Sequence, residues 1–199
     1  MAPIGQAIKG LERCLTFPNY NTNTQIYTND TNITSVIIGM MKKSNEICLI
    51  LDNIRSVLNV GAIFRTADAL LIDKIYLSGI TLTPIDRFGR KRADFHKTAL
   101  GAEDSVPYEH VESIEALLLK LRKNGFQIIA VEQSPKSVDY KKAKIRKPVA
   151  LIFGSETEGI SKQVLNLCET IIEIPMKGKK ESLNVSVSAG IVLFRLLDN

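Results

Sequence analysis

The stretch Val149-Ala-Leu-Ile-Phe153, followed at once by Gly154-Ser-Glu-Thr-Glu-Gly159, decides the fold class of this 199-residue chain. Five consecutive apolar residues with no polar alternation are typical of a strand buried on both faces, as in a parallel sheet. Similar apolar runs recur along the chain, and they predict further strands at residues 47–51, 74–77, 127–131 and 170–174. The sequence therefore predicts a mostly parallel sheet.

Helical patterns separate these strands. Apolar residues between Val60 and Leu71 follow the spacing of an amphipathic helix, and Asn59 is placed to cap it. Further helices are predicted over residues 113–124 and 161–167 and, with Ser182 as its cap, in the last segment of the chain. This alternation predicts an α/β fold with helices on both faces of the sheet.

The N-terminal segment differs from the rest of the chain. Residues 16–34 are rich in Asn and Thr without an apolar period, so we expect a loop or disorder there. A short helix at residues 4–15 and a short strand or packing segment at 36–41 are also expected. We thus divide the chain into a partly disordered extension, 1–45, and one α/β domain, 46–199.

Composition restricts the partners and the compartment. The net charge of +5 makes a polyanionic partner plausible. The three cysteines lack the number and spacing of a disulfide framework or a zinc site, and the two histidines form no ligand cluster, so no metal is expected. Neither a membrane-spanning run nor a secretory signal is evident, and a cytoplasmic protein is the expectation.

Polar residues and glycines cluster at three predicted strand ends, where open α/β sheets bind ligands. In the first cluster, Asn59 and Arg65 lie six residues apart across the start of a helix. Asn59 could simply cap the helix, and Arg65 could be a surface arginine paired with a nearby carboxylate. In the second cluster, Gly154 and Gly159 bracket Glu156, which predicts a tight turn where backbone approaches a ligand, or else an ordinary loop.

The third cluster is Ile174-Pro-Met-Lys-Gly-Lys-Lys-Glu-Ser-Leu-Asn-Val-Ser-Val-Ser188. Ser182 could be present only because it caps the helix that follows. Asn184, Ser186 and Ser188, however, are poor helix formers placed in the first two turns of a predicted helix. Such a conflict between local preference and structure is typical of functional sites.

Together the three clusters resemble the signature motifs of the SpoU/TrmH family in the SPOUT superfamily of methyltransferases. The matching residues are Asn59, Gly61 and Arg65 for N-x-G-x-x-x-R, Gly154, Glu156 and Gly159 for G-x-E-x-x-G, and residues 174–186 for I-P-M-x-G-x-x-x-S-L-N-V-S. The resemblance covers about residues 46–199 and leaves 1–45 outside it.

The resemblance implies a C-terminal deep trefoil knot that holds S-adenosylmethionine, in a protein that acts as a homodimer. The implied cofactor contacts are Glu132, Gly154, Ile174, Met176 and Leu183. The chain has no G-x-G-x-x-G after its first strand, which argues against a Rossmann-type site.

The implied reaction is methylation of a ribose 2′-hydroxyl in tRNA or rRNA, with Arg65 activating the hydroxyl. Because an arginine side chain stays protonated in proteins, we prefer a charged Arg65 that places a phosphate and stabilises developing alkoxide charge. Asn59, Glu156, Ser182 and Asn184 would position Arg65 and the substrate. An inactive RNA-binding protein and an RNA base methyltransferase are the alternatives.

Two basic stretches are candidates for contact with RNA. Arg87, Arg90, Lys91, Arg92 and Lys97 are predicted to lie in a loop together with His96 and two aromatic residues, Phe88 and Phe95. The second stretch spans residues 141–147. Such runs are often solvated surface. We favour RNA for the first stretch, because its aromatic rings could stack on an unpaired base.

Overall fold

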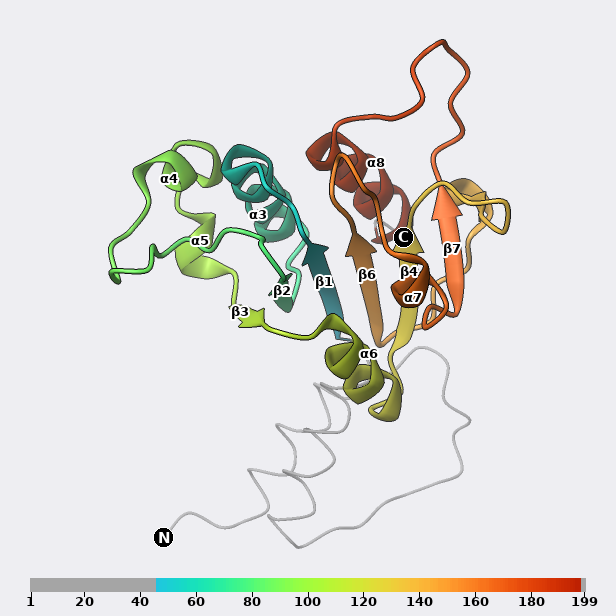
Figure 1. The fold of residues 1–199 in the computed structure, drawn as a ribbon, viewed down its shortest axis with the longest axis horizontal. Coiled ribbons are helices and arrows are strands. Elements are labelled where there is room, and N and C mark those ends of the chain that lie inside the picture. The colour runs from blue at the N-terminus through green and yellow to red at the C-terminus, as the bar shows by residue number, and fades with distance from the viewer. Residues whose placement is uncertain (1–45, 198–199) are drawn as a thin grey trace, which may run out of the picture. The chain divides into compact units, whose positions relative to one another are not determined.

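The protein is described by a computed structural model that covers residues 46–197 (Figure 1). The predictions for residues 4–15, 16–34 and 36–41 lie outside the described residues. Within the described range, none of the helices has the length and apolar character needed to cross a bilayer.

A seven-stranded sheet in the order β3-β2-β1-β6-β4-β7-β5 forms the centre of the fold. Every pairing between these strands is parallel, which confirms the predicted sheet. The strands are β1 Ile47–Asp52, β2 Lys74–Ser78, β3 Tyr108–Val111, β4 Gln127–Val131, β5 Val138–Asp139, β6 Val149–Phe153 and β7 Thr170–Glu173. The five predicted strands are present. The short edge strands β3 and β5 were not predicted, because neither has a continuous apolar run.

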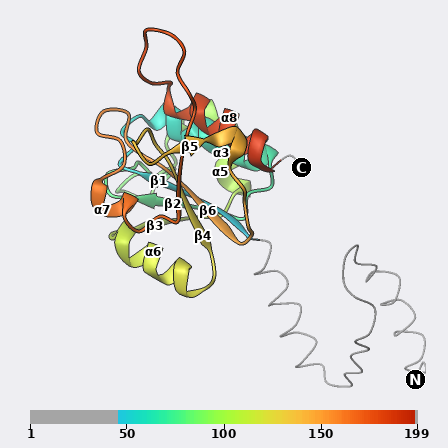
Figure 2. The same cartoon turned by 90° about the vertical axis from the view of Figure 1, so that its right-hand side faces the viewer.

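Helices cover both faces of the sheet, as predicted (Figures 1 and 2). They are α3 Val57–Ala69, α4 Ala93–Ala99, α5 Ala102–Ser105, α6 Ile114–Lys123, the 3-10 helix η1 Tyr140–Lys142, α7 Lys162–Leu165 and α8 Val185–Leu197. Alternate side chains of β1 enter two separate cores, since successive residues of a strand point to opposite faces. Leu49 and Leu51 pack in the core beneath α3, α4, α5 and α8, whereas Cys48 and Ile50 pack beneath α6 and α7.

Two predicted helix caps are wrong. Ser56 caps α3, because its Oγ accepts a hydrogen bond from the Asn59 backbone N–H at 3.3 Å. The Asn59 side chain is therefore available for other contacts. Helix α8 begins at Val185, three residues after Ser182. Asn184 takes the capping role, since its Oδ1 accepts a hydrogen bond from the Ser186 N–H at 2.9 Å.

The first basic stretch is only partly a loop, which corrects the prediction. Its second half forms α4, and Phe95 on that helix is completely buried. The Phe95 ring packs edge-on against Phe64 of α3, with 5.2 Å between ring centroids. Phe88 alone of the two aromatic residues is exposed.

The close packing of α3 on α4 explains the glycine of the first motif. A Cβ atom on Gly61 would lie 2.2 Å from the Thr98 Oγ1 and 2.9 Å from the Phe95 carbonyl oxygen. Only a glycine lets the two helix backbones approach this closely.

Candidate active site

The fold brings the three predicted clusters into contact through the side chain of Asn59. The Asn59 Nδ2 donates a hydrogen bond to Glu156 Oε1 at 2.5 Å, and Asn59 Oδ1 accepts one from Asn184 Nδ2 at 3.1 Å. Glu156 and Asn184 are 97 and 125 residues away along the chain. Asn59 on α3 thus connects the loop after β6 to the residue that caps α8.

The loop after β6 is the tight turn that its two glycines predicted. The Gly159 N–H donates to the Ser155 carbonyl at 2.9 Å, and Gly159 has a φ of 65°. A Cβ atom on Gly154 would lie 2.6 Å from Ile160 Cγ1 and 2.7 Å from the Gly159 carbonyl carbon. Both glycines are therefore required for the turn to fold back on its own strand.

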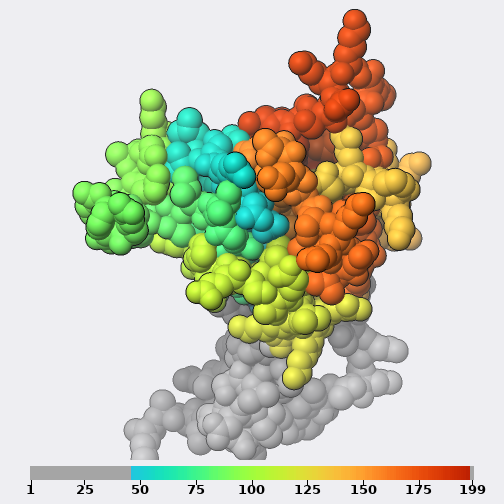
Figure 3. Space-filling view, viewed as in Figure 1, coloured from blue at the N-terminus to red at the C-terminus, as the bar shows by residue number. Residues whose placement is uncertain are grey.

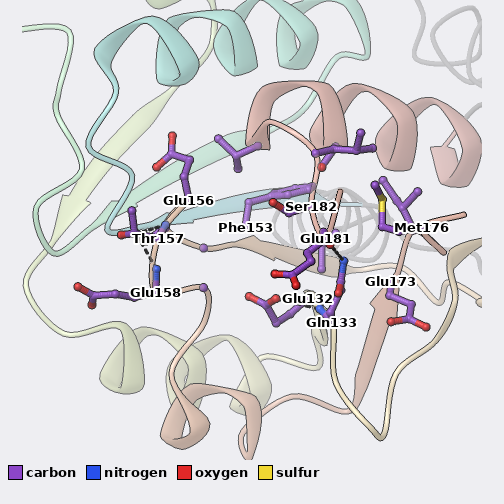
Figure 4. A pocket seen from close by; sticks show the side chains of 18 residues that line it. Glu132, Gln133, Phe153, Glu156, Thr157, Glu158, Glu173, Met176, Glu181 and Ser182 are labelled. Carbon is purple, nitrogen blue, oxygen red and sulfur yellow. Dashed lines mark hydrogen bonds between the residues drawn. The ribbon is translucent and has the colours of Figure 1, made fainter. Parts of the chain in front are cut away.

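A pocket of about 410 Å³ opens at the carboxyl ends of β4, β6 and β7 (Figure 4). All five residues predicted to contact the cofactor line it, namely Glu132, Gly154, Ile174, Met176 and Leu183. Glu156 and Ser182 also line the pocket. Asn59 and Asn184 do not line it. Asn59 contacts the lining residue Glu156, and Asn184 contacts Asn59.

Glutamates are the only charged residues in the lining of the pocket. Figure 4 shows Glu156 and Glu158 at one side, Glu132 and Glu181 in the centre and Glu173 at the other side. No Lys, Arg or His is among the residues that line it. The pocket is thus negative in a chain whose net charge is +5, and it favours a ligand with positive charge.

Glu132 also holds the loop after β6 in place. Its Oε2 accepts a hydrogen bond from the Ile160 N–H at 2.8 Å, and its Oε1 accepts one from the Gln133 N–H at 2.9 Å. The Gln133 amide in turn donates to the Glu181 carbonyl on the segment between β7 and α8. Sequence reasoning missed Gln133, Glu173 and Glu181, although the first two lie at strand ends.

Comparison with known proteins decides the family. The sequence profile described as the SpoU rRNA Methylase family matches residues 46–194. The chain belongs to the SpoU rRNA methylase family. This bears out the resemblance that the three motifs indicated.

Two curated relatives in the SpoU family illustrate the similarity. The chain is 35% identical to the 23S rRNA (guanosine-2′-O-)-methyltransferase RlmB of Nitrosomonas europaea, over 73% of this chain and 54% of the relative. It is 31% identical to the tRNA (guanosine(18)-2′-O)-methyltransferase of Aquifex aeolicus, over 77% of this chain and 69% of the relative. The chain thus spans about half the length of the first of these relatives.

A solved structure with the same fold is the AdoMet-bound rRNA methyltransferase from Sinorhizobium meliloti. It matches with a TM-score of 0.69 and 29% identity, over 76% of this chain and 56% of that chain. The TrmH/SpoU tRNA modifying enzyme of A. aeolicus matches with a TM-score of 0.67 and 27% identity, over 82% and 81% of the two chains.

Arg65, the motif arginine of the SpoU family, takes no part in the hydrogen bonds that join Asn59, Glu156 and Asn184. Its side chain is exposed on α3 and does not line the pocket. Within residues 46–197 it makes no ion pair or hydrogen bond through its side chain, so the expected alternative of a surface pair with a carboxylate is not observed there. The described residues therefore leave the Arg65 guanidinium available to a ligand.

The cations predicted to bind RNA are partly engaged within the chain. Ion pairs join Arg90 to Asp86 at 2.8 Å, Lys91 to Asp104 at 2.8 Å, and Arg92 to Asp94 at 3.4 Å. Arg87 and Lys97 form no ion pair with any other described residue. His96 pairs with Glu103 at 2.6 Å. The part of the chain that the structure describes contains no cluster of three or more His, Cys, Asp or Glu side chains suited to a metal ion.

In the second basic stretch, Arg146 is a structural residue. Its guanidinium donates to the Gly125 carbonyl at 3.2 Å and to Glu169 at 3.4 Å. Lys141, Lys142 and Lys144 are exposed.

Proposed function

We propose that this protein transfers a methyl group from S-adenosylmethionine to a ribose 2′-hydroxyl of an RNA, either tRNA or rRNA. The observation that carries the proposal is the Asn59 contact with Glu156 and Asn184, which assembles the three SpoU motifs beside an acidic pocket. Relatives named as guanosine-2′-O-methyltransferases support the reaction class.

The pocket fits S-adenosylmethionine in size and in charge. Its volume of about 410 Å³ lies in the range usual for small-molecule sites, about 300–1,000 Å³. Backbone groups near Gly154, Ile174, Met176 and Leu183 would hold the adenine and ribose. The cofactor supplies an electrophilic methyl group on a positively charged sulfonium, and the five glutamates suit that charge and the charge of the ammonium group. Glu132 would keep the loop after β6 in its binding shape.

The residues of this chain place the acceptor. Asn59, fixed at both ends of its amide by Glu156 and Asn184, holds Glu156 at the pocket edge. Ser182, which lines the pocket, would complete the polar ring. The charged Arg65 would bind the RNA phosphate and stabilise the developing alkoxide, while a phosphate oxygen or water takes the proton. Alignment of the acceptor with the methyl group then supplies much of the rate. No metal has a role in this scheme.

We further infer a homodimer whose interface includes α8, and a C-terminal trefoil knot around the pocket. Val187, Ile191 and Phe194 form an exposed apolar stripe on α8, with 50%, 36% and 48% of their surfaces accessible. Their i, i+4, i+7 spacing suits packing against a second helix. Membership of the SpoU family supports the knot.

RNA would bind through Arg87, Arg90, Lys91, Arg92 and Lys97, which cluster on the segment between β2 and α4 and on α4 itself. Ribosomal or transfer RNA as substrate favours a cytoplasmic protein. The acidic pocket repels phosphates, so contacts with the RNA backbone belong to cations outside its lining, which are these five and Arg65.

The proposal is tested by mapping 2′-O-methyl positions in RNA from cells with and without this protein. We expect one position, or a small set, to lose its methyl group when the protein is absent and to regain it in vitro with purified protein and S-adenosylmethionine. A base-methylated nucleoside as the product would support the base methyltransferase instead. Absence of cofactor binding by calorimetry would indicate an inactive RNA-binding protein.

A further inference from the structure

The loop between β2 and α4 has a rigid tip, formed by residues 85–91. The Asp86 N–H donates to the Arg90 carbonyl and the Gly89 N–H to the Asp86 carbonyl, each at 2.9 Å. Asp86 Oδ1 accepts hydrogen bonds from the N–H groups of Phe88 at 2.8 Å and Arg90 at 2.9 Å. An antiparallel bridge between Ile85 and Lys91 closes the base of the tip. The side chain of Asp86 thus fixes the backbone of this tip.

This tip presents an exposed aromatic ring between two arginines. Phe88 has 66% of its surface accessible, although large apolar side chains normally pack in a core. The guanidinium carbons of Arg87 and Arg90 lie 4.7 and 5.0 Å from the centroid of the Phe88 ring. Both distances are within the range of cation–π contact.

The two arginines are held differently. Arg90 is locked to Asp86 by contacts of 2.8 Å from both its Nε and its terminal nitrogen. Arg87 has the Phe88 ring as its contact and makes no ion pair with another residue of the described range. Arg87 can therefore leave the ring for a phosphate without breaking an ion pair, whereas Arg90 stays in place.

We propose that Phe88 is a stacking site for an unpaired nucleobase of the substrate RNA, with Arg87 moving to a neighbouring phosphate as the base arrives. The proposal rests on the proposed function only in taking RNA as the partner. Every base has an aromatic face, and arginine and aromatic side chains are the usual platforms for unstacked bases in RNA recognition. In a duplex the faces of the bases are already covered, so the site selects single-stranded or looped RNA.

The stacked base is not the nucleotide that is methylated in the same chain's pocket. The loop follows β2, while the pocket lies at β6, β4 and β7, on the other side of β1 in the sheet. Figures 1 and 3 show the loop, in green, at the left of the molecule and the segments around the pocket, in orange and red, at the right. Phe88 would therefore recognise an unpaired nucleotide elsewhere in the substrate.

The absence of tryptophan from the sequence permits a direct test. The Phe88→Trp variant of this 199-residue chain has a single tryptophan, whose fluorescence reports stacking. We expect single-stranded RNA oligonucleotides to quench it at the concentrations at which they bind, and a blunt duplex of the same sequence to bind without quenching. Leu119→Trp, at an exposed position of α6, is the matched control and should show no quenching. Equal quenching by the duplex, or none with any RNA that binds, would overturn the proposal.

Affinity measurements separate stacking from charge. Phe88→Leu should weaken binding of single-stranded RNA by about tenfold with an unchanged salt dependence, and Phe88→Tyr should bind like the wild type. Arg87→Gln should lower the slope of log affinity against log salt by about 0.7, the value for one phosphate contact on a single strand. Wild-type affinity in Phe88→Leu would contradict the proposal. The quenching and affinity assays measure RNA binding and do not require methyl transfer. They therefore test the stacking site even if the protein lacks the proposed activity.

Discussion

Asn59 uses both ends of its side-chain amide, and this is possible because another residue caps its helix. Ser56 satisfies the free N–H at the start of α3. The Asn59 nitrogen therefore faces the Glu156 carboxylate, and its oxygen faces the Asn184 amide. An amide is the side-chain group that donates at one end and accepts at the other, as this position requires.

Replacing Asn59 tests this arrangement at the residue scale. We expect Asn59→Ala to lower kcat/KM by about 10- to 100-fold, since a hydrogen bond to a charged group is lost. Asn59→Asp should lower it further, because a second carboxylate would face Glu156 at close range. Steady-state kinetics of the two variants give kcat/KM for each. An Asn59→Asp enzyme as active as Asn59→Ala would contradict the proposed hydrogen bond from the Asn59 amide to Glu156.

Arg65 provides the second prediction at this scale. Arg65→Ala should abolish turnover and leave the affinity for S-adenosylmethionine nearly unchanged, because Arg65 lies outside the pocket lining. Single-turnover kinetics and calorimetry measure the two effects separately. The exposed Arg122 of α6, changed to Ala, is the control. Retention of a tenth of wild-type activity by Arg65→Ala would exclude the proposed role.

At the scale of elements, the contact between α3 and α4 depends on one glycine. We expect Gly61→Ala to lower the free energy of unfolding by about 1–2 kcal/mol, because the clash with the Phe95 carbonyl outweighs the better helix propensity of alanine. Urea unfolding measures this change. Adding Thr98→Ala removes the side-chain part of the clash and should restore part of the loss. An unchanged free energy of unfolding in Gly61→Ala would show that α3 and α4 can move apart without loss of stability.

Strands that are buried on both faces could be predicted from the sequence. Short edge strands and the residues that cap helices could not. Strand β6 is apolar throughout, and β1 is apolar up to its last residue, Asp52, because helices cover both faces of these strands. In contrast, β5 is a two-residue edge strand, and it is too short to form an apolar run that predicts a strand. The cap was assigned to Ser182 instead of Asn184, because either residue type satisfies a helix N-terminus and only the fold selects between them.

The same distinction applies to the candidate site. The cofactor residues predicted by resemblance all line one pocket, since motif order and strand order place them at one edge of the sheet. The contact of Glu132 with the Ile160 N–H and the contribution of Glu181 depend on how loops fold over one another. Sequence periodicity contains no information about such contacts. Phe95 was expected in a loop because its helix, α4, has only seven residues.

At the scale of the whole molecule, charge is divided between two regions. Glutamates are the only charged residues that line the pocket. One group of exposed cations lies on the loop after β2, and another, Lys177, Lys179 and Lys180, lies on the segment between β7 and α8. A positively charged cofactor and a polyanionic substrate would thus be drawn to different parts of the same protein. Methyl transfer then requires only that the substrate ribose reach the edge of the pocket.

The apolar stripe on α8 gives a prediction for the assembly. We expect a homodimer in sedimentation experiments at micromolar concentration, and a monomer for the double variant Ile191→Asp and Phe194→Asp, because charges would be buried at the interface. The exposed Leu119 of α6 lies on the other face, and Leu119→Asp should remain dimeric. A monomeric wild-type protein would count against the proposed interface.

The most direct test of the central claim changes one atom of the substrate. An RNA carrying 2′-deoxyribose at the target nucleotide retains the phosphates and the bases through which we propose it binds. We expect this RNA to bind with nearly the affinity of the unmodified substrate and to receive no methyl group from S-adenosylmethionine. Methylation of the deoxy substrate at the normal rate would mean that a base atom is the acceptor, and it would contradict the account.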